Sequence, residues 1–492
     1  MVTKSALAAL AVGLCTSLAV VPVMAQNQNA TTNVTVNPTQ PKASIPETAI
    51  GLNTAVWDPN LMDASIPSML RSAGIKVLRY PGGSTSDIYQ WKTNSITEGQ
   101  SSSIVAKDNF KNFMKLVRKS RAQAMITVNY GTNPAGTGPA SPAYAAAWVK
   151  YANVTHHDNV KYWEIGNEIY GDGFYGSSWE ADLHKDKGPA AYAKYALQFI
   201  DAMKKVDPSI KIGIVVTAPG NWPDGQTPSW NNTVLKAIGD KIDFVDVHWY
   251  AQQPGHESDA GLLASTTTIP GMVQTLKNEI QRDAKGNAKN VQIMTTETNS
   301  VAYNPGKQSV SVVNALFLVK DYATWLSEGV ANVDWWDLHN SITTGTNNSP
   351  ALYGNTNYGD YGVLSSGTSS GALKEPPANT PFPAYYALEM LHHFIVPGDS
   401  FVSASSSNSD IVAYGARQGS KSVSAVVLNQ SPDTSHAVSV DVKGWKIGHK
   451  VNLYTYGENT KSIQIGTAKV VAGNIQIVLP PYTMVVVRAA KA

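Results

Sequence analysis

The chain has 492 residues, of which 43% are hydrophobic and 15% charged, and its formal net charge is +2 at pH 7. This composition excludes a disordered or collagen-like chain, and the length suits a large α/β barrel with a smaller second domain. The small net charge, without any stripe of Lys and Arg, argues against nucleic acid or an acidic polymer as partner.

Residues 1–25 have the pattern of a signal peptide. Lys4 supplies the basic start, residues 6–21 are apolar, and Val23-Met24-Ala25 forms a small-residue cleavage site. We therefore expect a secreted or periplasmic protein that has no membrane contact after cleavage. An uncleaved membrane anchor is the alternative.

Cys15, the single cysteine, lies inside this segment, so the mature chain is expected to contain no thiol. That excludes a cysteine metal site and a thiol nucleophile. The adjacent histidines at 156–157 and 392–393 cannot easily share one ion, and no third ligand accompanies them. We expect no metal and no cofactor, which leaves hydroxyl and carboxylate chemistry.

Residues 26–48 are polar, and the alternating run 33–37 within them is a candidate strand of the C-terminal domain. From residue 49 to 396, short apolar runs alternate with helical segments. Several runs are continuously apolar, which is typical of parallel strands covered on both faces. The repeat predicts a (β/α)₈ TIM barrel, with a doubly wound open sheet as the alternative. The eight predicted strands are 50–54, 75–80, 124–130, 160–166, 210–216, 244–250, 291–297 and 333–338.

Further signals place three helices and the second domain. Helices are predicted to begin at Pro189, to cover 312–328, and to cover 383–394 before a Pro-Gly pair. Residues 340–380, rich in Gly, Ser, Thr and Asn, predict a long loop that shapes the cleft. Residues 397–492 contain β-rich runs joined by turn residues and predict an all-β sandwich.

Two glutamates stand where barrel enzymes carry their functional groups, at the C-terminal ends of strands. Glu168 follows the fourth predicted strand and Glu297 ends the seventh. Two carboxylates facing each other across one barrel mouth, roughly 5 Å apart, are what a retaining glycosidase needs. A single strand-end glutamate would be explained by an ion pair or by solvation.

The motifs around these residues resemble the clan of retaining (β/α)₈ glycosidases, and within it the family 51 α-L-arabinofuranosidases. The similar segments are 77–83 (VLRYPGG), 89–92 (YQWK) and 162–168 (YWEIGNE). The resemblance implies that Glu168 is the acid/base and Glu297 the nucleophile, that a carbohydrate is the substrate, and that a β-sandwich follows the barrel.

Three positions depart from that family pattern. Ser84 follows Pro-Gly-Gly in place of Asn, Asn53 ends the first strand in place of Glu, and Thr298 follows Glu297 in place of Trp. The alternatives therefore include an endo-xylanase, a glucanase, a β-xylosidase, a β-glucuronidase, a transglycosylase, or a non-catalytic glycan-binding protein on the same scaffold.

Four further polar residues are candidates for substrate binding, among which Asn53 is placed by its strand end. Asn167 is expected to hydrogen-bond the sugar 2-hydroxyl, with a strand-end cap as the alternative. Arg79 is expected near Glu297, where it would keep that carboxylate ionised, while Glu168 should lie further from positive charge; a structural salt bridge is the alternative. His248 is the fourth candidate.

His248 and Tyr250 share one side of the sixth strand by the period of two, so Tyr250 is expected to donate to the nucleophile and His248 to line the sugar site. A buried, backbone-bonded histidine is the alternative. Trp335 and Trp336 point opposite ways, and Trp336 is the expected sugar platform. Candidate loop aromatics for further subsites are Trp57, Trp91 and Trp222.

Overall fold

The computed structural model describes residues 31–345, 357–458 and 460–492, so the predicted signal peptide lies outside the described residues. Parallel strands form a closed barrel in the order β2-β3-β6-β7-β8-β9-β10-β11, which confirms the TIM-type barrel and excludes the open sheet. The strands are β2 (Ile50–Asn53), β3 (Val77–Tyr80), β6 (Gln123–Val128), β7 (Tyr162–Ile165), β8 (Lys211–Thr217), β9 (Phe244–Gln252), β10 (Gln292–Val301) and β11 (Asn332–Trp335).

Each predicted apolar run overlaps one barrel strand, because the runs are buried by the barrel interior on one side and by helices on the other. Strand β10 differs from the prediction, since it continues four residues beyond Glu297. Its pairing with β9 slips between Thr295 and Glu297, so that two residues of β10 stand opposite one residue of β9. This bulge sets Glu297 directly across from His248.

Helices cover the outside of the barrel. The predicted helices at 189, 312–328 and 383–394 are confirmed as α4, α8 and α9, and α4 and α9 begin with a proline at their first position. The helices are α1 (Ile66–Ser72), α2 (Phe110–Ser120), α3 (Pro142–Val149), α4 (Pro189–Val206), α5 (Trp230–Ile238), α6 (Asp259–Ser265), α7 (Ile269–Asp283), α8 (Val312–Ser327) and α9 (Pro383–Phe394).

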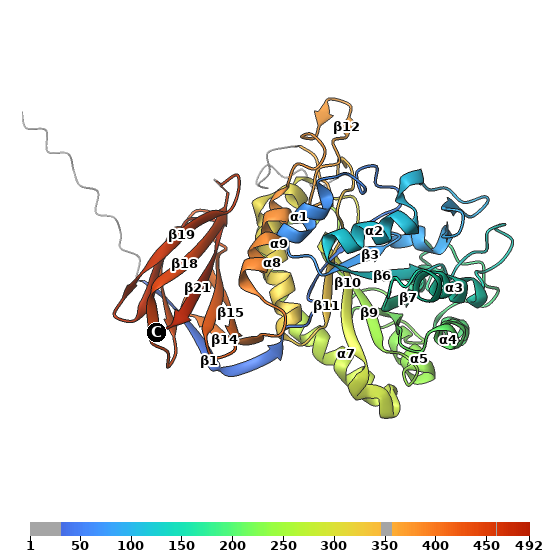
Figure 1. Cartoon of the computed structure of the whole chain (residues 1–492), viewed down its shortest axis with the longest axis horizontal. Coiled ribbons are helices and arrows are strands. Elements are labelled where there is room, and N and C mark those ends of the chain that lie inside the picture. Colours follow the sequence, from blue (N-terminus) through green and yellow to red (C-terminus); the bar gives the residue numbers. More distant parts are fainter. Residues whose placement is uncertain (1–30, 346–356, 459) are drawn as a thin grey trace, which may run out of the picture.

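A second, all-β unit stands beside the barrel (Figure 1). Its pairing closes in the order β1-β14-β15-β16-β21-β18-β19-β20-β17, so its two faces are joined at both edges. The N-terminal strand β1 pairs with β14 and β17 and carries the run 33–37. The strands are β1 (Thr32–Ser44), β14 (Ser400–Ser406), β15 (Ile411–Gln418), β16 (Ser422–Asn429), β17 (His436–Val442), β18 (Ile447–Gly457), β19 (Gln464–Val471), β20 (Asn474–Leu479) and β21 (Thr483–Lys491).

Helices α8 and α9 lie between the barrel and the β unit (Figure 1). His393 of α9 stacks on Tyr454 at 3.9 Å, and Tyr386 stacks on Tyr456 at 5.0 Å. Burial lowers the pKa of His393 to about 4, so it packs as a neutral ring. His393 of the 392–393 histidine pair therefore belongs to this interface.

The loop after β11 contains a small hairpin, β12 (Ser369–Ser370) with β13 (Leu373–Lys374), and residues 346–356 of it lie outside the described residues. None of its described residues lines the cavity at the barrel mouth, and the expectation that this loop shapes the cleft stays a prediction because part of the loop is not described. Another hairpin, β4 (Tyr89–Gln90) with β5 (Ser95–Ile96), follows β3. Within the described ranges, no helix combines the length and apolar character needed to cross a bilayer.

Candidate active site

A cavity of about 800 Å³ opens at the C-terminal ends of the barrel strands. Six of the predicted site residues line it: Asn167, Glu168, His248, Tyr250, Glu297 and Trp336. Arg79 and Asn53 are buried and do not line the cavity, so a direct contact with substrate does not follow from their position.

Glu297 is held by one donor on each carboxylate oxygen. Nη1 of Arg79 lies 2.7 Å from Oε1, and the Tyr250 hydroxyl donates to Oε2 at 2.8 Å. Both partners were expected from their strand positions. The carboxylate is 6% exposed, which leaves it open only toward the cavity.

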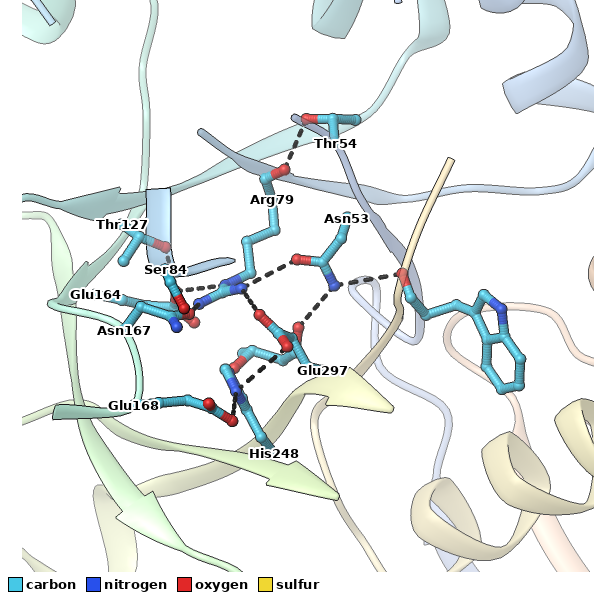
Figure 2. Close-up of polar contacts among 12 residues, drawn as sticks. Asn53, Thr54, Arg79, Ser84, Thr127, Glu164, Asn167, Glu168, His248 and Glu297 are labelled. Atoms are coloured by element: carbon cyan, nitrogen blue, oxygen red, sulfur yellow. Dashed lines mark hydrogen bonds and ion pairs between the residues drawn. The ribbon is translucent and has the colours of Figure 1, made fainter. Parts of the chain in front are cut away.

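Arg79 organises the floor beneath the cavity (Figure 2). Besides Glu297, its guanidinium donates to Glu164 at 2.6 Å and to the side-chain oxygens of Asn53 and Asn167, each at 3.0 Å. Burial alone would lower the pKa of Arg79, but the charges of Glu164 and Glu297 raise it above its usual value. The arginine therefore stays charged and fixes four acceptors at once.

Asn53 completes this floor. Its amide nitrogen donates to the backbone oxygens of Thr296 at 2.9 Å and Trp335 at 3.3 Å. Because its side chain is satisfied by Arg79 and by these carbonyls, it supports the strand that carries Glu297. The departure from the family pattern at this position thus lies below the cavity and not in its wall.

Glu168 lies in the turn after β7 and has the left-handed backbone conformation, with φ of 43°. For a residue with a side chain this conformation costs of order 1–3 kcal/mol and is most often found at functional sites. Its carboxylate accepts from the Tyr170 hydroxyl, the Trp179 indole and the His248 imidazole, each at 2.9 Å.

His248 stands between the two carboxylates (Figure 2). Its Nδ1 is 2.9 Å from Oε1 of Glu168 and 3.5 Å from Oε2 of Glu297. Burial alone would raise the pKa of Glu168, but the hydrogen bonds of His248 and of the neighbouring donors lower it. Burial alone would lower the pKa of His248, but the charge of Glu297 and the bond to Glu168 raise it.

The prediction that Glu168 lies further from positive charge than Glu297 is thus only half met. Arg79 pairs with Glu297, yet the imidazole of His248, which is a cation when protonated, contacts Glu168. The pKa of Glu168 is lowered and that of His248 is raised, so each group favours the charged form of the other.

Asn167 is fixed from both ends of its amide. Its oxygen accepts from Arg79, and its nitrogen donates to Glu180 at 2.9 Å. Ser84, the residue that departs from the family pattern, also donates to Glu180, at 2.6 Å. The backbone of Asn167 donates to Asp87 at 2.8 Å. The amide therefore presents its remaining N–H in one orientation only.

The aromatic residues divide between the cavity and the core. Trp336 lines the cavity, while Trp335 is buried against the helices, as their opposite directions predicted. Trp222 also lines the cavity. Trp91 does not, because it is buried in a stack with Trp148 at 5.4 Å. Trp91 therefore contributes no surface to the cavity that contains Glu168 and Glu297.

Several residues that matter here were assigned no role from the sequence. Tyr170, Trp179 and Glu180 all follow β7 in a segment without periodicity, and Glu164 lies inside the barrel. A charged residue within an otherwise apolar strand was the available signal for Glu164. For the other three, the turn that folds back onto Glu168 had to be known first.

Within the described ranges, one group of side chains has the spacing to hold a metal ion: Glu168, His248 and Glu297, with one potential ligand atom from each lying within 4.8 Å of the others. These atoms already share hydrogen bonds with one another and with Arg79 and Tyr250. All three side chains therefore already have polar partners within the protein.

Comparisons with known proteins find glycoside hydrolases. The chain resembles family 51 α-L-arabinofuranosidases. No protein-family model matches it. An intracellular exo-α-(1→5)-L-arabinofuranosidase of Acetivibrio thermocellus is 24% identical over 226 residues, which are 42% of this chain and 42% of that protein. The match thus spans less than half the length of that relative.

Solved structures share the fold over nearly the whole chain. An α-L-arabinofuranosidase from Thermotoga maritima has a TM-score of 0.70 at 18% identity, covering 93% of this chain and all of that one. A bifunctional glucanase-xylanase from a metagenome library has a TM-score of 0.68 at 14% identity, covering 94% and 100%. At these identities the likeness shows the arrangement of barrel and β unit.

Proposed function

We propose that this protein is a retaining glycoside hydrolase in which Glu297 is the nucleophile and Glu168 the acid/base. The observation that carries the proposal is the spacing of the two carboxylates, which bring one oxygen each to within 4.8 Å. Retaining enzymes hold their carboxyl groups about 5–5.5 Å apart, whereas inverting enzymes leave about 6.5–9.5 Å for a water molecule.

The contacts of the two glutamates assign each of them a role in the two steps of the double displacement. Oε1 of Glu297 is tied to Arg79 and Oε2 to Tyr250, which orients the carboxylate toward the anomeric carbon. As the carboxylate oxygen bonds to that carbon, the bond to the leaving oxygen breaks and Glu168 donates a proton to it. Water then attacks the glycosyl-enzyme, Glu168 takes its proton, and Glu297 is released.

His248 supplies the proton that Glu168 donates to the leaving oxygen. Its Nδ1 faces both carboxylates, so a proton held there passes to Glu168 without entering solvent. When Glu297 becomes an ester its charge disappears, and the largest influence that raises the pKa of His248 disappears with it. The imidazole therefore stays neutral after it has given up its proton, and Glu168 remains a carboxylate that takes the proton of the attacking water.

We propose an α-L-arabinofuranoside as the substrate, because the sequence relative and the solved structure described above are both arabinofuranosidases by name. A glucan or xylan is the second candidate, supported by the similarity of the fold to the bifunctional glucanase-xylanase. The panel test is hydrolysis of aryl α-L-arabinofuranoside, β-xyloside, β-glucoside and β-glucuronide. Release from the arabinofuranoside supports the first candidate. Hydrolysis of xylan or glucan without hydrolysis of any aryl glycoside of the panel supports the second candidate.

The stereochemistry tests the retaining mechanism separately. Proton NMR of the first sugar released should show the anomer of the substrate before mutarotation. The inverted anomer would reject the double-displacement mechanism even if the protein hydrolyses glycosides.

We also propose that the protein is exported, on the basis of the signal-peptide pattern in residues 1–25. N-terminal sequencing of protein recovered outside the cytoplasm should begin at Gln26. Recovery in the cytoplasm with residues 1–25 intact would contradict export.

A further inference from the structure

Trp179 joins the acid/base to the wall of the cavity. Its indole N–H donates to Oε2 of Glu168 at 2.9 Å, while its side chain lines the cavity and the residue is 43% exposed. A half-exposed tryptophan whose polar edge is already bonded presents mainly apolar ring surface to a ligand.

Close packing fixes the position of this indole. The Trp179 ring lies so near Gly171 that a Cβ on the glycine would come within 2.5 Å of it. The Trp179 backbone also donates to the Gly171 oxygen at 3.0 Å, and the Tyr170 ring meets the indole edge-on at 6.0 Å. The ring therefore has one face against the protein and the rest toward the cavity.

Trp222 extends the same wall. Its ring centroid is 5.3 Å from that of Trp179, the two planes are inclined by 52°, and Trp222 is 41% exposed. Trp179 follows β7 and Trp222 follows β8, so two neighbouring barrel loops contribute to one aromatic surface beside Glu168.

We propose that Trp179 and Trp222 bind the leaving group of the substrate, a pyranose ring with an apolar face, and that Trp179 is also a positioning residue for Glu168. This inference rests on the proposed function. An acid that protonates the leaving oxygen must touch it, so the leaving group lies on the Glu168 side of the cavity. The exposed aromatic surface on that side is the Trp179–Trp222 wall.

The indole N–H also stabilises the ionised form of Glu168, because it donates to a carboxylate oxygen. Trp179 consequently contributes both to leaving-group binding and to proton transfer by Glu168. Removing the N–H alone and removing the ring surface alone should have different consequences, and two variants separate them.

The test compares Trp179→Phe and Trp222→Ala with wild type, using methyl α-L-arabinofuranoside and an arabinosylated xylotriose as substrates. Trp179→Phe keeps a ring but loses the N–H donor to Glu168. The alkaline limb of the pH profile of kcat/KM, where Glu168 loses its proton, should therefore move to higher pH. Trp222→Ala should leave the limb in place but lower the ratio of kcat/KM for the xylotriose to that for the methyl glycoside about three- to tenfold.

Trp445→Phe is the matched control, because Trp445 lies in the β unit and is partly buried there. It should change neither the pH limb nor the substrate ratio. An unshifted limb in Trp179→Phe would reject the positioning role, and an unchanged ratio in Trp222→Ala would reject the leaving-group surface. If wild type hydrolyses neither these substrates nor any of the panel glycosides or polysaccharides, the proposed function itself fails.

Discussion

Nδ1 of His248 lies 2.9 Å from Oε1 of Glu168, so a hydrogen bond joins the imidazole to the expected acid/base. Arg79 neutralises Glu297 from the other side of the site. The two carboxylates thus differ in partner: one is paired with a permanent cation and the other with a group that titrates. That difference matches a nucleophile held beside a fixed cation and an acid/base that gains and loses a proton.

The pKa of His248 should depend on the charge of Glu297. Burial opposes the imidazolium, and the charge of Glu297 is the largest influence that raises the pKa above the ordinary 6.5. Neutralising that carboxylate should therefore lower it. NMR titration of His248, assigned with a His248→Asn variant, should give a higher pKa in wild type than in Glu297→Gln. Equal values in the two proteins would show that Glu297 does not set the protonation of His248.

Replacing Glu168 by Gln should affect substrates according to their leaving group. A poor leaving group, such as an alkoxide, needs the proton, and its hydrolysis should fall by about 10²–10⁴-fold. An activated phenolate leaves without help, so its hydrolysis should fall much less. Steady-state kcat/KM for methyl and 2,4-dinitrophenyl glycosides gives the comparison. Equal losses on both would count against the acid/base role.

Arg79 should contribute strongly to stability, because Arg79→Met leaves Glu164 and Glu297 buried without their cation. The cost of such a change is about 3–5 kcal/mol in the free energy of unfolding. Arg118→Met is the matched control, since Arg118 is 57% exposed in its pair with Asp158 and surface pairs contribute about 0–1 kcal/mol. Urea denaturation measures both. Similar losses in the two variants would contradict the role of Arg79.

Trp336 depends on the absence of a side chain at Gly83. A Cβ there would lie 2.8 Å from Cη2 of Trp336, at a φ of +47°. Gly83→Ala should displace the indole and reduce kcat/KM by about tenfold or more. Gly99→Ala has the same kind of backbone, with φ of +79°, but no atom within 4 Å, so it should cost only about 1 kcal/mol of stability. If both variants keep full activity, Trp336 is not a platform for substrate.

The barrel could be predicted because parallel strands covered on both faces are short and largely apolar, and several of the eight runs were continuously apolar. Glu168, Glu297 and Tyr250 could be placed for a related reason, since strand ends of a closed barrel meet at one mouth. The contact of Arg79 with Glu297 followed from the same geometry.

The rest depended on three-dimensional detail that has no sequence period. The bulge in β10 sets Glu297 across from His248, and it arises from a shift in pairing that the pattern does not encode. Trp179 reaches Glu168 from eleven residues further along the chain through a turn. Asn53 ends a strand as expected, but it is buried beneath Arg79, where it supports the strand that carries Glu297 and does not line the cavity.

Glu297 as the nucleophile is the central claim, and kcat for an aryl α-L-arabinofuranoside in Glu297→Gln tests it most directly. Glu98→Gln, at an exposed position, is the control for substitution itself. We predict that Glu98→Gln retains wild-type turnover while Glu297→Gln loses at least about 10⁴-fold, because no covalent intermediate forms without the carboxylate. Turnover by Glu297→Gln within tenfold of wild type would contradict the assignment of the nucleophile.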